Sequence, residues 1–338
     1  MSINIGVIGT GGIGQGHIER LNNQTADAKV VAVNDINKET AAIVGEKYGA
    51  KVYDNPHVLI DAPDVDAILV ASWDPTHEEF CTAAIRAGKP VFCEKPLADT
   101  SEGCKRIMQE EMKTGKRLLF LGFMRRYDAG YRELRYAIES GRLGNPLILH
   151  CKHRNMHPSG AAHTTDMSVT GSLVHEFDVI RYLIGEDDPY ISAQLVCPRR
   201  AKYADEDLID PQLIYLETKS GIRINLETFV NCHYGYDVQC EVVGDEASAS
   251  LPDPSHIQVR EAGTIGFEIK PSWQDRFPEA YVVEMNEWVS DIKSGIVTGP
   301  SAWDGYVTAK VAECCIESRE TKQIVPIDLG ECPAFYKK

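Results

Sequence analysis

The sequence has no apolar run of membrane-spanning length, and its first residues lack the basic segment and apolar core of a signal peptide. A helix that crosses a bilayer needs about 20 consecutive apolar residues, and a secretory signal needs a short apolar core of its own. Both absences argue against a membrane-embedded or secreted protein. We therefore expect a cytoplasmic protein.

Cysteine pairs with metal-binding spacing are also missing. The chain has ten cysteines, but no two of them form a Cys-x-x-Cys pair, and most lie in apolar strand or helix patterns. Zinc and redox sites commonly use such pairs, whereas cysteines in apolar segments are typical of buried, reduced thiols. We expect neither disulfides nor a bound metal.

No block of like charges occurs, although 50 Asp and Glu outnumber 35 Lys and Arg and the net charge is -15. An acidic surface repels the phosphates of nucleic acids, so we expect no nucleic-acid partner. A hydrophobic content of 43% and a charged content of 25% are typical of a globular protein. A chain of 338 residues without internal repeats favours two domains of ordinary size.

A glycine-rich turn follows the first apolar run of the chain. Residues 3–8 have the pattern of a buried parallel strand, Gly9, Gly11 and Gly14 form the pattern G-x-G-x-x-G, and residues 13–21 continue as a helix. Gly9 allows the sharp turn, Gly11 lets a pyrophosphate approach the backbone, and Gly14 lets the helix pack against the strand. The helix N-terminus then presents N–H groups to the phosphates. This strand, turn and helix predict a dinucleotide-binding unit.

Asp35 ends the second predicted strand, at about the twenty-residue distance from the glycines at which a ribose is bound. Its carboxylate would accept hydrogen bonds from both ribose hydroxyls of NAD and would repel the 2′-phosphate of NADP. The sequence therefore favours NAD as the cofactor. Lys38 is the nearby cation that leaves NADP open.

The first third of the chain alternates strands with helices, which predicts an α/β fold with a Rossmann-type parallel sheet over residues 1–122. Ligands of such sheets lie at the carboxyl ends of the strands. Two predicted loops at these ends therefore matter, at residues 72–77 and 93–97. The predicted cofactor-binding residues are Gly9, Gly11, Gly12, Ile13, Gly14, Asp35, Ser72, Trp73, His77, Glu94 and Lys95.

The pattern changes after residue 122. A helix is expected over 171–184 and two more over 280–293 and 303–318, with a run of strands between them: 191–196, 212–217, 223–230, 237–243, 256–260 and 264–269. Successive strands joined by turns predict a C-terminal α/β domain, residues 123–338, with a large, mainly antiparallel open sheet. Because such a sheet commonly pairs with a second copy, we expect an oligomer.

Two polar segments carry groups suited to catalysis. Glu94-Lys95-Pro96 directly follows an apolar strand, and a lysine there would stabilise negative charge on a substrate oxygen. His175 and Asp178 are three residues apart, which places them on one helix face. Histidine is suited to accept a hydroxyl proton near neutral pH. A surface lysine and a structural histidine are the alternatives.

These motifs, in this order, resemble those of the Gfo/Idh/MocA oxidoreductases. Longer segments extend the similarity almost from end to end: VFCEKPLA at 91–98, GFMRRYD at 122–128, TTDM at 164–167, NCHYGYD at 231–237 and AWDGY at 302–306. More narrowly, the chain resembles the bacterial myo-inositol 2-dehydrogenases. The resemblance implies NAD-linked oxidation of an inositol ring hydroxyl to a ketone by a homotetramer.

The resemblance also implies roles for single residues. Lys95 and His175 match the catalytic lysine and base of the family. Matches to the polyol pocket or the nicotinamide edge are Arg125, His153, Asp178, Tyr234, Trp273 and Tyr281. A ring with many hydroxyls needs such donors and acceptors, although Tyr234 and Trp273 would also suit a core.

Gly171 departs from the family pattern, which has aspartate four residues before the histidine. Glycine cannot orient the imidazole of His175. Another carboxylate could take the place of the aspartate, and Asp178, Asp166 and Glu94 are the candidates. Alternatively, the extra space at Gly171 could fit scyllo-inositol or another sugar or polyol. As a third alternative, the protein could be a non-catalytic regulator that binds NAD and a sugar. Retention of both Lys95 and His175 favours an enzyme.

Overall fold

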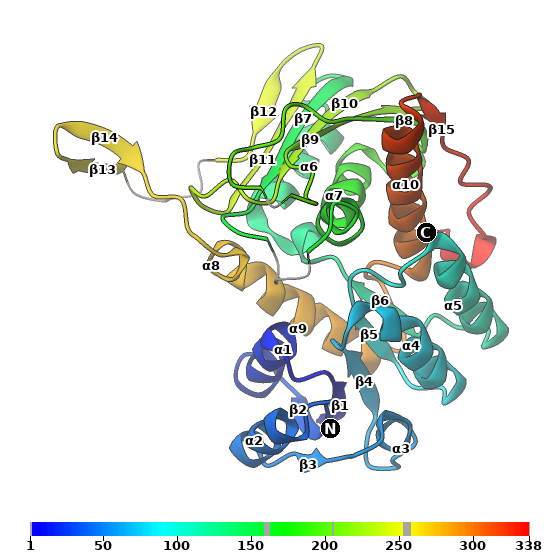
Figure 1. Cartoon of the computed structure of the whole chain (residues 1–338). Helices are drawn as coiled ribbons and strands as arrows, with labels where there is room; N and C mark the ends of the chain where they lie inside the picture. The colour runs from blue at the N-terminus through cyan, green and yellow to red at the C-terminus, as the bar shows by residue number, and fades with distance from the viewer. Residues whose placement is uncertain (1, 159–162, 205, 253–257, 338) are drawn as a thin grey trace. The chain divides into compact units, whose positions relative to one another are not determined.

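The computed structural model describes residues 2–158, 163–204, 206–252 and 258–337. Its contacts divide the chain into two compact units (Figure 1). The first unit comprises Met1–Met124, Tyr281–Ala309 and Glu331–Lys338, and the second comprises Arg125–Ala280 and Lys310–Gly330. Among the described residues, no helix combines the length and apolar character that a membrane crossing needs.

The first unit contains a six-stranded sheet in the order β3-β2-β1-β4-β5-β6, with every neighbouring pair parallel. Its strands are β1 (Ile3–Ile8), β2 (Ala28–Asn34), β3 (Lys51–Val52), β4 (Ala67–Val70), β5 (Val91–Glu94) and β6 (Leu119–Gly122). Strands β4, β5 and β6 are buried along their whole length, as expected when helices cover both faces of a parallel sheet. The strand order reverses between β1 and β4, where ligands of open α/β sheets bind.

The helices of this sheet are α1 (Gly12–Asn23), α2 (Lys38–Tyr48), α3 (Pro56–Ile60), α4 (His77–Arg86) and α5 (Ser101–Lys113). Helices α1 and α2 pack on β2, and α4 packs on β4 and β5. The Asn37 side chain caps α2 by accepting the Thr40 N–H, and Gly49 ends it at a φ of 65°. Most of α9 (Pro278–Ser294) and the start of α10 (Ala302–Thr321) also belong to this unit.

The second unit contains a seven-stranded sheet in the order β12-β11-β7-β10-β9-β8-β15. Its strands are β7 (Pro146–Arg154), β8 (Tyr190–Val196), β9 (Gln212–Thr218), β10 (Arg223–Phe229), β11 (Asp237–Gly244), β12 (Ser248–Ser250) and β15 (Val325–Pro326). The β7–β10 pair is parallel and the other pairs are antiparallel. Burial alternates along β9 and β10, so one face is covered and the other exposed. Helices α6 (Ala129–Glu139) and α7 (Val174–Ile184) pack on each other, and α7 packs on β7.

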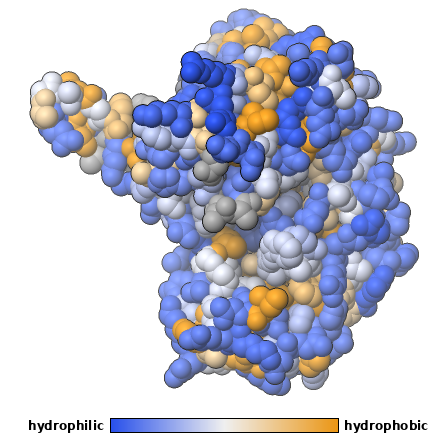
Figure 2. All heavy atoms as spheres, viewed as in Figure 1, coloured by the Kyte–Doolittle hydropathy of each residue, from blue (hydrophilic) through white to orange (hydrophobic). Residues whose placement is uncertain are grey.

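A separate hairpin of β13 (Gln258–Glu261) and β14 (Thr264–Phe267) belongs to the second unit (Figure 1). Apolar atoms are visible on its surface (Figure 2), where Ile265 and Phe267 are 61% and 47% exposed. The sequence predicted both strands, although the expected start of the first, His256, lies outside the described residues.

The main error in the predicted elements concerns the segment before His175. The expected helix over 171–184 begins only at Val174, and a π-helical turn, Ser168–Ser172, precedes it. The helical periodicity of the sequence continues through this turn, so it did not reveal the wider winding. Short elements such as α3 and α8 (Trp273–Arg276) were also missed, because four or five residues do not establish a period.

Candidate active site

A cavity of about 660 Å³ opens at the carboxyl ends of β1, β2 and β4 in the first unit. Its lining residues include five of the predicted cofactor-binding residues, namely Gly9, Gly11, Asp35, Ser72 and Trp73. The cavity therefore lies where the strand order reverses, as the sequence predicted for a nucleotide.

The three motif glycines are required for different reasons. Gly9 has a φ of +98°, and a Cβ there would lie 2.3 Å from the Ala71 carbonyl oxygen. A Cβ on Gly14 would lie 2.0 Å from the Gly9 oxygen, so the helix could not approach the strand. At Gly11 and Gly12 a Cβ would meet nothing within 4 Å in the part of the chain that the structure describes, which leaves space at the start of α1. This space and the helix N-terminus fit the phosphates of a dinucleotide.

Asp35 is held in a fixed orientation at the cavity wall. One carboxylate oxygen, Oδ2, accepts hydrogen bonds from the Thr10 backbone N–H (2.6 Å) and hydroxyl (2.9 Å), and Oδ1 accepts from the Asn37 N–H (2.8 Å). Lys38, the cation that left NADP open, pairs instead with Asp54 at 2.8 Å. Asp54 also lines the cavity, so the carboxylates of Asp35 and Asp54 both contribute negative charge near Lys38.

The remaining predicted cofactor residues differ in accessibility. Trp73 is 75% exposed at the cavity, and Ile13 is partly exposed in the first turn of α1. His77 is buried, and its ring nitrogens lie 2.7 Å from the Pro96 carbonyl oxygen and 3.1 Å from that of Ser72. His77 thus links the two loops that the sequence singled out.

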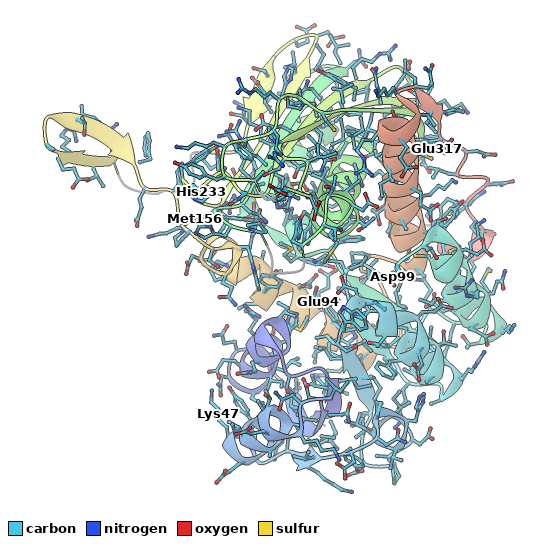
Figure 3. The ribbon with its side chains drawn as sticks, viewed as in Figure 1. Lys47, Glu94, Asp99, Met156, His233 and Glu317 are labelled. Carbon is cyan, nitrogen blue, oxygen red and sulfur yellow. The ribbon has the colours of Figure 1, made fainter. Side chains whose placement is uncertain are left out.

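Glu94, the last residue of β5 (Figure 3), is buried and bonds to a histidine of α1. His17 Nε2 donates to Glu94 Oε1 across 2.7 Å, and the Lys95 N–H donates to Oε2 across 3.1 Å. Burial raises the pKa of Glu94, but the hydrogen bond from His17 and the charges of His17 and Lys95 outweigh it, and the net pKa lies below the usual value. The carboxylate therefore supports the segment that carries Lys95.

Tyr281 belongs to the first unit. Its ring meets that of His17 edge-on at 5.7 Å between centroids, and the Arg20 guanidinium lies 4.6 Å from its centre. Tyr281 is 5% exposed, so most of its surface packs α9 against α1.

His175 lies in the first turn of α7 in the second unit and is 7% exposed. Gly171 lies within the preceding π-helical turn, and a Cβ there would meet no atom of the described residues within 4 Å. Two of the carboxylates proposed to replace the missing aspartate are engaged by arginines. Arg126 donates to both oxygens of Asp178, at 2.8 and 2.5 Å, and Arg319 donates to Asp166 at 2.6 Å.

Arg125 and His153 meet at a buried carboxylate that the sequence analysis did not single out. Arg125 Nη1 donates to Glu176 Oε1, and His153 Nδ1 lies 2.8 Å from Glu176 Oε2. The second guanidinium nitrogen, Nη2, lies 3.4 Å from the Tyr236 hydroxyl. The structure thus joins two predicted substrate residues through Glu176.

Tyr234 and Trp273 stand outside this cluster. Tyr234 follows β10 and is 47% exposed, and burial of the remainder raises its pKa to about 12. Trp273 is the first residue of α8 and is partly exposed. Neither is packed into the core, which was the alternative for both.

Some signal for the missed residues was present in the sequence. Arg125 and Arg126 are consecutive, and two acids, Glu176 and Asp178, follow His175 closely. The sequence thus offered two acidic partners for two adjacent arginines. Buried arginines require acidic partners. His17 stands on the apolar face of α1, where a histidine needs a buried partner.

Two family models cover nearly the whole chain. The NAD-binding Rossmann-fold domain of an oxidoreductase family matches residues 3–123, and the C-terminal α/β domain of the same family matches residues 135–329. The chain belongs to the Gfo/Idh/MocA oxidoreductase family. The predicted family, the fold class and NAD as the cofactor are thereby confirmed.

Relatives within the Gfo/Idh/MocA family are similar over their full length. An inositol 2-dehydrogenase of Serratia proteamaculans is 53% identical over 341 residues, covering 100% of both chains. An inositol 2-dehydrogenase of Azotobacter vinelandii is also 53% identical and covers 99% of both. The crystal structure of myo-inositol dehydrogenase from Lactobacillus casei with NAD(H) and myo-inositol superposes with a TM-score of 0.95 at 37% identity, covering 100% of both chains.

Proposed function

We propose that the protein is an NAD-dependent dehydrogenase that oxidises a ring hydroxyl of inositol to a ketone, with myo-inositol as its principal substrate. Full-length identity of 53% to an inositol 2-dehydrogenase carries this proposal. The Asp35 carboxylate, held toward the cavity by Thr10 and Asn37, supports NAD over NADP.

When bound, NAD would supply the acceptor for the hydride of the ring carbon. The chain supplies the proton chemistry: His175 takes the proton of the hydroxyl, and Lys95 donates a hydrogen bond to the same oxygen and stabilises its negative charge. Residues proposed to contact the polyol are Arg125, His153, Asp178, Tyr234, Trp273 and Tyr281. Residues 1–122 form the proposed NAD-binding domain, and residues 123–338 the proposed substrate and oligomerisation domain.

Gly171 supports a second candidate function. Since it replaces the aspartate expected one helical turn before His175, the protein could oxidise scyllo-inositol or another polyol, or could bind NAD and a sugar without catalysis. The open space around Gly171 is compatible with an aspartate at this position. The position can therefore be tested by a single substitution.

The deciding experiment measures NADH formation with a panel of inositol isomers and hexoses, for the protein and for Gly171→Asp. If the protein is active on one isomer and Gly171→Asp abolishes or redirects that activity, Gly171 is a determinant of specificity and the substrate is identified. An inert protein whose Gly171→Asp variant gains myo-inositol oxidation would favour the non-catalytic function. NAD binding without turnover of any polyol by either protein would refute the dehydrogenase proposal.

We further propose a cytoplasmic homotetramer. All ten cysteines are free thiols, which suits a reducing compartment. Buried and more exposed residues alternate along β9 and β10, so one face of the seven-stranded sheet is exposed. This exposed face supports pairing of sheets between subunits.

A further inference from the structure

Glu176 divides its two oxygens between a cation and an imidazole. Oε1 accepts from Arg125 Nη1, and Oε2 lies 2.8 Å from His153 Nδ1. The three side chains are almost fully buried, with residue exposures of 1% for Arg125, 3% for His153 and 1% for Glu176. Water therefore has little access to this contact, and the protein groups themselves decide where the hydrogens lie.

The charge on Glu176 determines which groups donate. Burial raises its pKa, but the positive charge of Arg125 and the hydrogen bonds from His153 and Arg125 outweigh burial, and the net pKa lies below the usual value. The group is therefore a carboxylate, which only accepts, while a guanidinium only donates. An unprotonated Nδ1 would direct its lone pair at Oε2 across 2.8 Å, which is repulsive. Nδ1 therefore carries a hydrogen and donates it to Glu176.

The longer contact of Nδ1 agrees with this arrangement. Arg125 Nη2 also lies within hydrogen-bonding distance of Nδ1, but at 3.3 Å it is farther away than Glu176 Oε2 at 2.8 Å, so the carboxylate is the nearer partner of Nδ1. The ring of Tyr236 meets that of His153 edge-on at an interplanar angle of 84°. Packing and hydrogen bonding together fix the imidazole in one orientation.

The other ring nitrogen remains available. Among the residues that the structure describes, no group bonds to Nε2 of His153, whereas Nδ1 contacts both Glu176 and Arg125. In a neutral imidazole with a hydrogen on Nδ1, Nε2 has a lone pair. It is then an acceptor without a partner among the described residues.

We propose that Glu176 is a positioning residue that fixes His153 in the Nδ1–H tautomer, so that Nε2 accepts a hydrogen bond from a substrate hydroxyl. This inference rests on the proposed function, in which His153 contacts the polyol. It deepens that function because it requires the substrate to carry a hydrogen-bond donor at the ring position that faces Nε2. A hydroxyl meets this requirement, whereas an ether or keto oxygen there does not.

The test is ¹⁵N NMR of the whole protein labelled at histidine, with the His153 signals assigned by their loss in His153→Gln. We expect Nδ1 protonated and Nε2 unprotonated near neutral pH. Protonation of Nε2, in either the other tautomer or the imidazolium, would overturn the inference. Because this readout needs neither NAD nor turnover, it remains valid if the proposed function fails.

Glu176→Gln provides a directional test. Arg125 still requires an acceptor, so the amide oxygen is expected to face Arg125 and the amide nitrogen to donate to Nδ1, which moves the ring hydrogen to Nε2. We expect this tautomer change, together with a KM for the active polyol that is raised about tenfold and a kcat that changes less. Tyr236→Phe is the control, because it keeps Glu176 and should keep the Nδ1–H tautomer. An unchanged tautomer in Glu176→Gln would overturn the inference, and the spectrum of the unsubstituted protein decides the matter if this variant does not fold.

Discussion

Asp35 carries the preference between the two nicotinamide cofactors. We expect Asp35→Ser to raise the KM for NAD by about 10- to 100-fold, because hydrogen bonds to a charged group contribute roughly 1.5–3 kcal/mol. The KM for NADP should fall, since a carboxylate no longer faces the 2′-phosphate. Asp54→Asn removes the other cavity carboxylate and should change the KM for NAD far less. Equal use of NAD and NADP by the unsubstituted protein would contradict the assignment.

Lys95 and His175 are expected to act directly on the reacting hydroxyl. Replacement of either by alanine should lower kcat by about 10²- to 10⁴-fold, the usual contribution of general acid–base catalysis. Steady-state kinetics with the active polyol measure this effect. Lys47→Ala and His57→Ala are matched controls, because both side chains are exposed and pair with surface acids. An unchanged rate in Lys95→Ala or His175→Ala would remove that residue from the mechanism.

Helix α7 is attached to the segment before α6 by two consecutive buried ion pairs. Glu176 pairs with Arg125, and Asp178 pairs with Arg126. Removing Asp178 deprives Arg126 of its buried bidentate partner and leaves it the partly exposed Glu186, at 2.7 Å. We therefore expect Asp178→Asn to lower the free energy of unfolding by about 3 kcal/mol, the lower end of the range for a broken buried pair, measured by urea denaturation.

The exposed pair Arg135–Glu139 provides the comparison for that change. Glu139→Gln breaks an i,i+4 pair on the surface of α6, which usually contributes about 0.3–0.5 kcal/mol. If Asp178→Asn were no less stable than Glu139→Gln, the buried pair would not be a significant attachment of α7.

The junction of α1 with β5 is expected to weaken in acid. The pKa of Glu94 is lower in the folded protein than its ordinary value of 4.5, so the folded state favours the carboxylate. This stabilisation is complete above about pH 4.5 and is lost as the pH falls through the lower folded pKa. Urea denaturation between about pH 6 and pH 3 should show a shallower loss of stability in Glu94→Gln than in the unsubstituted protein. Parallel pH profiles would contradict the linkage.

The proposed assembly would use the open sheet of the second unit. We expect a mass of about four times the 37.5 kDa chain in light scattering after size-exclusion chromatography. Tyr215 on β9 is 41% exposed, and Tyr215→Asp should produce smaller species by placing a charge in the subunit contact. Tyr136→Asp is the control, because Tyr136 is 72% exposed and lies on helix α6, not on a strand of the sheet. A monomer before any substitution would refute the assembly.

At the scale of the whole chain, the two units are built from separate segments, whereas the sequence pattern indicates a single division between two continuous domains. The segment Tyr281–Ala309 returns to the first unit, where Asn286 donates to the Gln24 carbonyl and Lys293 pairs with Asp27. These contacts join residues far apart in sequence. No change in composition or periodicity marks the return, so a division at residue 122 was the natural reading of the sequence.

Patterns among neighbouring residues were sufficient for the parallel sheet, the glycine turn and Asp35. Burial of a strand on both faces requires a continuous apolar run, and a tight turn at Gly9 requires a residue that tolerates positive φ, so both constraints appear directly in the order of residues. The family resemblance added the names of catalytic and substrate residues that these patterns alone would not have distinguished from structural ones.

The polar networks around those residues required the folded structure. His17 and Glu94 are 77 residues apart in sequence, and Arg125 and Glu176 are 51 apart. A buried charge must find its partner wherever the fold places one, and that distance in space is independent of the separation along the chain. For the same reason the family resemblance identified His153 and Asp178 as substrate residues, but only the packed structure revealed that Glu176 contacts His153 and that Arg126 contacts Asp178.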